Sequence, residues 1–227
     1  MAGNTIVQLR RSWKPHKERL SIKNPEHPTN VRFHRACSWL QRSEVLAVED
    51  LDLALLSQWV AFNALYGQWD HAAREPLADL QCWKHFLERM LSLDQENFVV
   101  DALVDNKPLV MSVFDDQFLS RHFWQEPSER RAGQSKKTWF DARTWFVMGN
   151  WSLILDRLFD RIYFLRCQLV HGAATHSSSL NRKALRNCTQ MMDHLLRAFL
   201  LVWCQYGSDE DWGIMCYPPV RAASAVR

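Results

Sequence analysis

An arginine and a histidine stand at the end of the most hydrophobic helix-like stretch of this chain. The stretch begins at Asn150 and ends in the sequence Arg166-Cys-Gln-Leu-Val-His171-Gly172. On an ideal helix Arg166 shares one face with four apolar residues, spaced by three or four positions: Leu155, Phe159, Ile162 and Val170. A guanidinium is costly to bury unless it meets an anion or a partner surface. Arg166 is therefore predicted to belong to a binding or catalytic site.

The pair Arg166 and His171 could perform acid–base chemistry on an anionic substrate. Histidine titrates near pH 6.5, and arginine donates two parallel hydrogen bonds to a phosphate. The spacing alone is a weak signal, because Arg11 and His16 repeat it. Residues five apart on a straight helix point about 140° apart. The two side chains converge only if the helix ends near His171, which Gly172 allows, or if a two-fold partner supplies the second group.

The composition is that of a soluble globular protein, with 47% hydrophobic and 23% charged residues, and favours one main domain. The net charge of +3 is too small to demand nucleic acid, although basic residues gather in the first 24 positions and over residues 130–137. Six cysteines without a CxxC pair argue against zinc and thioredoxin sites. The chain starts without an apolar signal segment and contains no apolar run of membrane-spanning length. We expect a cytoplasmic protein with reduced thiols and no membrane contact.

The pattern of apolar residues predicts an all-α fold, an antiparallel helical bundle with an inserted middle region of helices and loop. Residues 1–30, with three prolines, are expected to form an extended basic arm, 31–206 the helical domain, and 207–227 a poorly packed tail. The helix over 50–69 is apolar on nearly all sides and is expected to be central. Residues 125–137 are expected to form a polar loop, and one of Ser177 to Ser179 to cap the last helix. The expected helices cover about 29–48, 50–69, 76–93, 150–171 and 178–206, with shorter pieces over 95–105, 109–124 and 139–148.

Two segments of the chain resemble the HEPN superfamily. They are Trp59-Val-Ala-Phe-Asn-Ala-Leu-Tyr66 and Arg166-Cys-Gln-Leu-Val-His171-Gly172. The likeness is greatest to the Apea-like branch of bacterial defence and toxin–antitoxin settings, and covers roughly residues 31–206. HEPN proteins are all-α, commonly dimeric, and many are metal-independent ribonucleases. The family's Arg and His match Arg166 and His171, and Asn63 and Tyr66 match a structural feature of the branch.

The resemblance implies an endoribonuclease that cleaves RNA by attack of the ribose 2′-hydroxyl at a dimeric Arg/His site. His171 would transfer protons and Arg166 would hold the phosphate, without a cofactor or metal. An antitoxin or a defence-system protein is an expected partner. The candidates for supporting roles are Cys167, Gln168, His176, Asn63 and Tyr66. Ala173 stands where one branch carries a tyrosine that is adenylylated, so we expect no such regulation here.

Several alternatives stay open or are excluded by the sequence. Nuclease members usually carry Asn, Asp or His where this chain has Cys167, which favours a non-catalytic HEPN-type module that binds RNA, a nucleotide or a protein. A plain helical interaction protein, with an accidental motif, is a third possibility. A metal site at His171 and His176 lacks a third ligand at a useful spacing, and Asp115-Asp116 is better explained as a helix start. No Gly-x-Ser-x-Gly sequence supports a serine hydrolase.

Overall fold

The computed structural model describes residues 5–173, 175–179 and 181–219, and within them the chain is all-α, as predicted. The only strands in that part are β1 (Trp69–Asp70) and β2 (Glu75–Pro76), a short antiparallel pair. A 3₁₀ turn, η1, covers Gln117–Leu119. The described ranges contain ten α-helices: α1 (Ile6–Lys23), α2 (Pro28–Glu49), α3 (Leu51–Tyr66), α4 (Asp79–Leu93), α5 (Phe98–Asp105), α6 (Lys107–Asp115), α7 (Arg121–Gln125), α8 (Glu129–Met148), α9 (Trp151–Val170) and α10 (Arg182–Tyr206).

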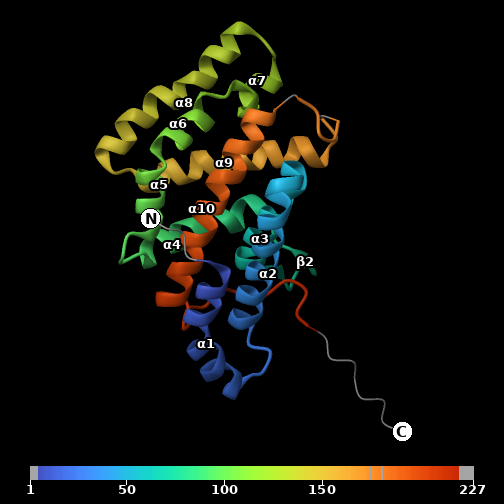
Figure 1. The fold of residues 1–227 in the computed structure, drawn as a ribbon, viewed down its shortest axis with the longest axis vertical. Helices are drawn as coiled ribbons and strands as arrows, with labels where there is room; N and C mark the ends of the chain where they lie inside the picture. The colour runs from blue at the N-terminus through green and yellow to red at the C-terminus, as the bar shows by residue number, and fades with distance from the viewer. Residues whose placement is uncertain (1–4, 174, 180, 220–227) are drawn as a thin grey trace.

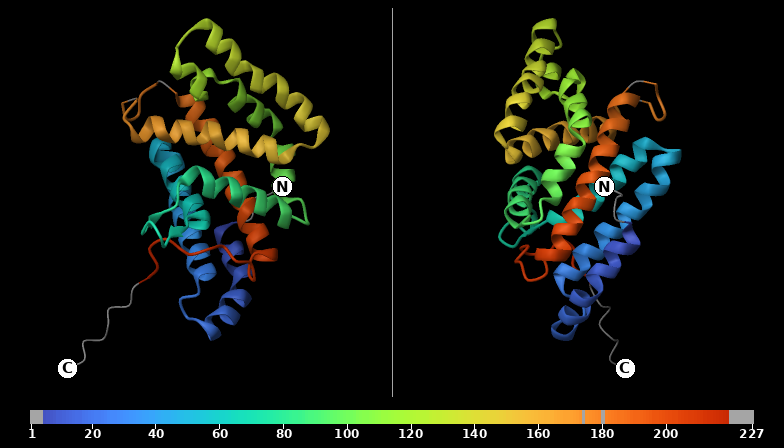
Figure 2. Two further views of the ribbon diagram at one scale, coloured as in Figure 1. Left: turned by 180° about the vertical axis from the view of Figure 1, so that it is seen from behind. Right: turned by 60° about the vertical axis from the view of Figure 1, so that its left-hand side comes forward.

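The last helix, α10, lies at the centre of the fold. It packs against α1, α2, α3, α4, α5, α6 and α9. Figures 1 and 2 show α1, α2 and α3 running alongside α10, while α4 and α9 cross it. The prediction that the helix over 50–69 is central was wrong. This helix, α3, pairs mainly with α2 and leaves Leu53 and Val60 on its outer side, 47% and 39% exposed.

The N-terminal arm is a helix and not an extended segment, so that prediction was wrong. Thr5 and Gln8 form a capping box at its start. Its buried residues recur at helical spacing and form a stripe that packs on α2 and α10: Ile6, Leu9, Trp13 and Leu20. The Trp13 ring stacks on Phe33 at 4.8 Å between centroids. Pro15 lies within the helix, where the burial of this stripe outweighs the loss of one backbone donor.

The C-terminal segment is also packed, which corrects the prediction of a loose tail for residues 207–219; residues 220–227 lie outside the described part. The Trp212 ring stacks on Trp203 with centroids 4.2 Å apart. Arg32, 1% exposed, donates hydrogen bonds to the carbonyls of Trp212 and Gly213 as well as Leu65 and Gly67. This buried arginine therefore fixes the segment to α2 and to the end of α3.

Helices α6, α7 and α8 of the middle region form the end of the molecule drawn at the top of Figure 1. The polar loop predicted over 125–137 was wrong, because α8 begins at Glu129 with Ser128 as its cap. Its polar first turns face water, so periodicity of apolar residues could not reveal them. The predicted cap of the last helix was wrong too: Asn181 precedes α10 and makes no capping bond with its side chain. Among the described residues, no helix has the length and apolarity that crossing a membrane requires.

Candidate functional site

The end of α9 is built as the sequence predicted, with Gly172 terminating the helix. The amide of Gly172 donates to the Leu169 carbonyl, at 3.2 Å, and that of Ala173 donates to the Gln168 carbonyl, at 2.8 Å. This pair of bonds is the Schellman motif, which requires a left-handed residue after the helix cap. Gly172 supplies it with φ of +67°. His171 is thereby fixed as the cap residue directly after α9, with an exposed side chain.

Arg166 lies at the edge of the core, on the face of α9 that carries the apolar row. Leu155, Phe159 and Ile162 are fully buried, but Val170 is 53% exposed, so the row leaves the core at Arg166, which is half-buried. The buried arginine of α9 is Arg161, 5% exposed.

Arg161 belongs to the core and is satisfied within it. Its Nη1 donates to the Asp116 carbonyl at 2.9 Å. Burial lowers the pKa of Arg161 to about 10, although Asp116 and Asp160 oppose that change. This arginine therefore stabilises the packing of η1 on α9 and is not available to a ligand.

The Arg166 guanidinium lies over the Tyr163 ring, 5.9 Å from its centroid. It forms no hydrogen bond or ion pair within the described part of the chain. Every other arginine there that is at least partly shielded from water has such a partner: Arg32, Arg35, Arg89, Arg131, Arg161, Arg182 and Arg197. Arg166 is thus a shielded cation with its donors unused, as an anion-binding group must be.

The family-motif residue Tyr66 faces the same region from α3. Its hydroxyl donates to Asp79 Oδ1 at 3.2 Å. Burial and the Asp79 carboxylate raise the pKa of Tyr66 far above its usual value, and the Arg166 charge acts in the opposite direction. Burial and a hydrogen bond with Cys167 likewise raise the pKa of Tyr163, which Arg166 again opposes. Both phenols therefore stay neutral near pH 7 and can donate or accept hydrogen bonds.

Asn63 lies one turn before Tyr66 and lines a cavity of about 370 Å³. The cavity is bordered by Trp39 and Val60, both partly exposed, and by Asp79. Asp79 also accepts the hydrogen bond from Tyr66, so the cavity that Asn63 lines lies next to Tyr66 and close to the charge of Arg166. The structure brings together the two sequence segments that carry the family resemblance, α3 and the last turns of α9.

His171 does not share the face of Arg166. Since α9 is helical through Val170, residues 166 and 171 point about 140° apart. Gln168 has a structural role: its Nε2 donates to the Phe118 carbonyl at 2.8 Å, and its Oε1 accepts from Asn181 at 3.3 Å. It ties α9 to η1 and to the start of α10.

His176, a further candidate, lies in a different cluster. Its Nε2 is 2.7 Å from Asp50 Oδ2, and this hydrogen bond raises the pKa of His176. One ligand atom each of Asp50, Asp52 and His176 lie within 4.8 Å of one another. Sequence reasoning missed both carboxylates, which are more than a hundred positions away. Asp52 already pairs with Arg182 at 2.5 Å and Asp50 caps α3, so the cluster is explained without a ligand.

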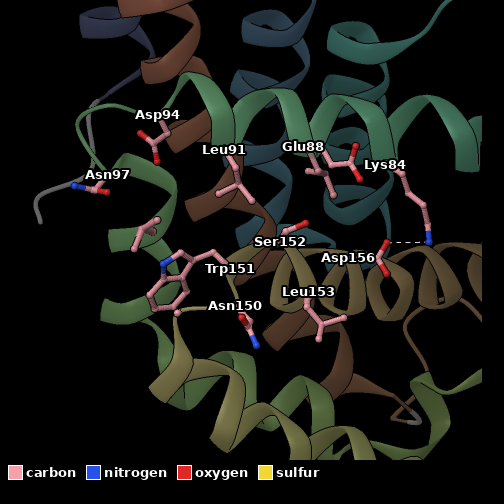
Figure 3. A pocket seen from close by; sticks show the side chains of 13 residues that line it. Lys84, Glu88, Leu91, Asp94, Asn97, Asn150, Trp151, Ser152, Leu153 and Asp156 are labelled. Carbon is pink, nitrogen blue, oxygen red and sulfur yellow. Dashed lines mark ion pairs between the residues drawn. The ribbon is translucent and has the colours of Figure 1, made fainter.

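Another cavity, which the sequence did not reveal, lies between α4 and the start of α9 (Figure 3). Its volume is about 930 Å³. Lys84 and Asp156 form an ion pair of 2.9 Å across it, and Asp94 at its far end caps α5. The lining holds neither arginine nor histidine, and its one lysine, Lys84, is already paired with Asp156, so we do not assign the phosphate chemistry to this cavity.

No protein-family model, no curated protein and no solved structure matches this chain.

Proposed function

We propose that this protein is a metal-independent endoribonuclease of the HEPN type, acting as a homodimer with Arg166 and His171 as its catalytic residues. The observation that carries the proposal is the unpartnered guanidinium of Arg166, half-buried over Tyr163 while every other shielded arginine of the described residues is satisfied. Such a group is preorganised to bind the phosphate of an RNA backbone and the charge that develops on it.

In this mechanism His171 moves the protons and Arg166 holds the phosphate. His171 takes the proton of a ribose 2′-hydroxyl, whose oxygen attacks the adjacent phosphorus, and the 5′-oxygen of the next nucleotide leaves with a proton. The products carry a 2′,3′-cyclic phosphate and a 5′-hydroxyl. DNA lacks the nucleophile and remains intact. The exposed position of His171 suits it to exchange protons with solvent between turnovers.

A second copy of the chain is required because Arg166 and His171 point apart within one chain. A two-fold axis near the end of α9 would place an arginine of one copy and a histidine of the other around one phosphate. The surface around the site suits such an interface. Val170, one turn after Arg166, is 53% exposed, and Trp39, Val60 and Leu77, which line the cavity beside Asn63 and Asp79, are at least one-third exposed. Apolar side chains that gather on a surface commonly mark a contact with another protein.

Cleavage of labelled RNA in the presence of EDTA tests the proposal. We expect wild-type protein to cut RNA but not single-stranded DNA, and His171→Ala and Arg166→Ala to lower the rate at least about 100-fold. Arg157→Ala and His85→Ala are matched controls, since both side chains are exposed on α9 and α4. Cleavage that persists in both catalytic variants, or that requires magnesium, would refute the mechanism.

The dimer is tested separately with Val60→Asp, which places a charge on the apolar surface. We expect sedimentation to show a dimer for wild type and a monomer for the variant, together with loss of cleavage. Leu53→Asp is the matched control, because Leu53 is similarly exposed on α3 but does not line the cavity that Val60 lines. A wild-type monomer that cleaves RNA would contradict the two-chain site.

A non-catalytic HEPN-type module that binds RNA, a nucleotide or a partner protein such as an antitoxin is the second candidate. Cys167 favours it, since this half-buried thiol interacts with Tyr163 at the position where nuclease members of the family usually carry Asn, Asp or His. This candidate predicts RNA or protein binding that Arg166→Ala weakens, without cleavage under any condition.

A further inference from the structure

A groove between α6 and α8 combines cations and aromatic rings in a way that neither the fold nor the proposed active site explains. Its volume is about 930 Å³, and its seven lining residues include two cations and no carboxylate: Lys107, Met111, Trp139, Phe140, Arg143, Thr144 and Val147. Phe140 is 59% exposed and Val147 82% exposed. These side chains are large and apolar for a surface that faces water.

Each cation of the groove lies over an aromatic ring. The Arg143 guanidinium is 5.6 Å from the centroid of Trp139, and the Lys107 ammonium is 5.0 Å from that of Phe146. Neither cation forms an ion pair with any residue in the described ranges. The rings hold both cations in place by cation–π attraction and leave their hydrogen-bond donors free.

The same face of α8 continues the positive charge beyond the groove. Lys136, Phe140, Arg143 and Val147 follow one another at three- and four-residue spacing, so they form one stripe about 16 Å long. Over its whole length α8 carries five cations against two carboxylates, an excess of three that equals the net charge of the entire chain.

We propose that the α6–α8 groove binds single-stranded RNA, with bases stacked on the exposed rings and phosphates contacting Lys107, Lys136, Lys137 and Arg143. A single strand offers both flat aromatic faces and a regular row of negative charges, and proteins bind it with this combination of rings and cations. An acidic protein segment would use the cations but would have no need of the rings.

The groove is connected to the end of α9. The 3₁₀ turn η1 packs on both α8 and α9, and Gln168, two positions after Arg166, donates to the Phe118 carbonyl of that turn. The inference deepens the proposed function and rests on it in naming RNA, because it defines the substrate as single-stranded. Binding and cleavage are measured separately, so either can fail alone.

Fluorescence anisotropy with a labelled 12-nucleotide single-stranded RNA tests the groove, using full-length His171→Ala protein in EDTA so that the probe stays intact. We expect Phe140→Leu to weaken binding about 5- to 150-fold, the range that one stacked base supplies, and Phe140→Tyr to retain most of the affinity. Loss of affinity in the leucine variant but not in the tyrosine variant is the signature of stacking. Equal affinity in both variants and wild type would overturn the proposal.

The electrostatic part is tested by changing Lys107, Lys136, Lys137 and Arg143 together to glutamine. We expect the slope of log affinity against log salt concentration to fall by up to about 3, since each phosphate contact on a single strand contributes about 0.7. The matched control replaces Arg11, Lys14, Lys17 and Lys23 of α1, four equally exposed cations, by glutamine. An equal loss in the control would overturn the assignment to this groove.

Two competitors identify the occupant. Single-stranded DNA of the same sequence is expected to compete with the RNA, and polyglutamate of equal charge to compete at least tenfold more weakly. Polyglutamate or anionic phospholipid vesicles that compete as well as DNA would overturn the proposal in favour of an acidic protein or a membrane surface. Circular dichroism confirms that each variant is folded. Binding without cleavage would refute the proposed function and leave the groove assignment intact.

Discussion

Alanine at Gly172 tests whether the left-handed end of α9 is a conformational requirement. A Cβ added at Gly172 would meet no atom within 4 Å, so the substitution causes no steric clash. The cost is that of holding an L-residue at φ of +67°, about 1–2 kcal/mol, less about 0.4–1 kcal/mol from the smaller entropy of the unfolded chain. We therefore expect Gly172→Ala to lower the free energy of unfolding by about 1 kcal/mol.

Gly133 is the matched control, since a Cβ there also meets no atom within 4 Å but its backbone is helical, within α8. Alanine in a helix interior is favoured over glycine by about 0.5–1 kcal/mol. Gly133→Ala is therefore expected to stabilise the protein. The free energies of unfolding of Gly133→Ala and Gly172→Ala are then expected to differ by about 2 kcal/mol. Gly172→Asn is expected to lie between wild type and Gly172→Ala, because asparagine tolerates the left-handed region.

Urea denaturation followed by circular dichroism measures these differences, provided that the dependence on urea is the same for all variants. Stabilisation by Gly172→Ala, or a shift of the same sign in both alanine variants, would refute the assignment of a strained helix end. Because Gly172 follows His171 directly, strain in Gly172→Ala is also expected to displace His171 and lower the rate of RNA cleavage. Gly133→Ala is expected to leave that rate unchanged.

Three further predictions concern the charged groups of the fold. Arg161→Ala is expected to lower the free energy of unfolding by about 3 kcal/mol, because the buried partners of Arg161 lose their donor. Arg166→Ala is expected to change it by less than about 1 kcal/mol. Urea titration of the two variants measures both values. The pKa of His176 is raised by its hydrogen bond to an aspartate, so the folded state binds that proton more tightly. The stabilisation by protonated His176 is then complete below pH 6.5 and is lost as the pH rises through the raised pKa. The difference in melting temperature between wild type and His176→Gln is therefore expected to shrink from pH 6 to pH 9. Arg32→Leu is expected to accelerate chymotrypsin cleavage within residues 207–219, which are otherwise tied down; unchanged cleavage would show that its hydrogen bonds do not hold the segment.

The sequence predicted the helices whose apolar residues recur at regular spacing and missed those hidden by other signals. The three prolines of residues 1–30 suggested an extended segment, although Leu9 and Trp13 stand four positions apart on a buried stripe. The start of α8 was missed because a surface helix can be polar all round in its first turns. The all-α class followed from periodicity, but which helix is central depends on tertiary packing.

The candidate site was predicted in part. Gly172 was recognised as the end of α9, because glycine is strongly preferred after a helix cap. The apolar row drew attention to Arg166, but it did not show that this face of α9 leaves the core after Ile162 or that Arg161 is the buried cation of the helix. No local signal indicates where a helix leaves the core. Contacts across long sequence separations, such as that of His176 with Asp50, also leave no trace in local spacing.

The central position of α10 determines the order in which the fold can close during synthesis. The Cys204 thiol donates to the Leu9 carbonyl across 195 positions of sequence, and Arg19 pairs with Asp209 across 190. On the ribosome, helices α1 to α9 emerge before the helix that most of them pack against. The apolar surfaces that α10 covers therefore stay exposed until α10 emerges, so the last step of folding joins segments that lie far apart in the sequence.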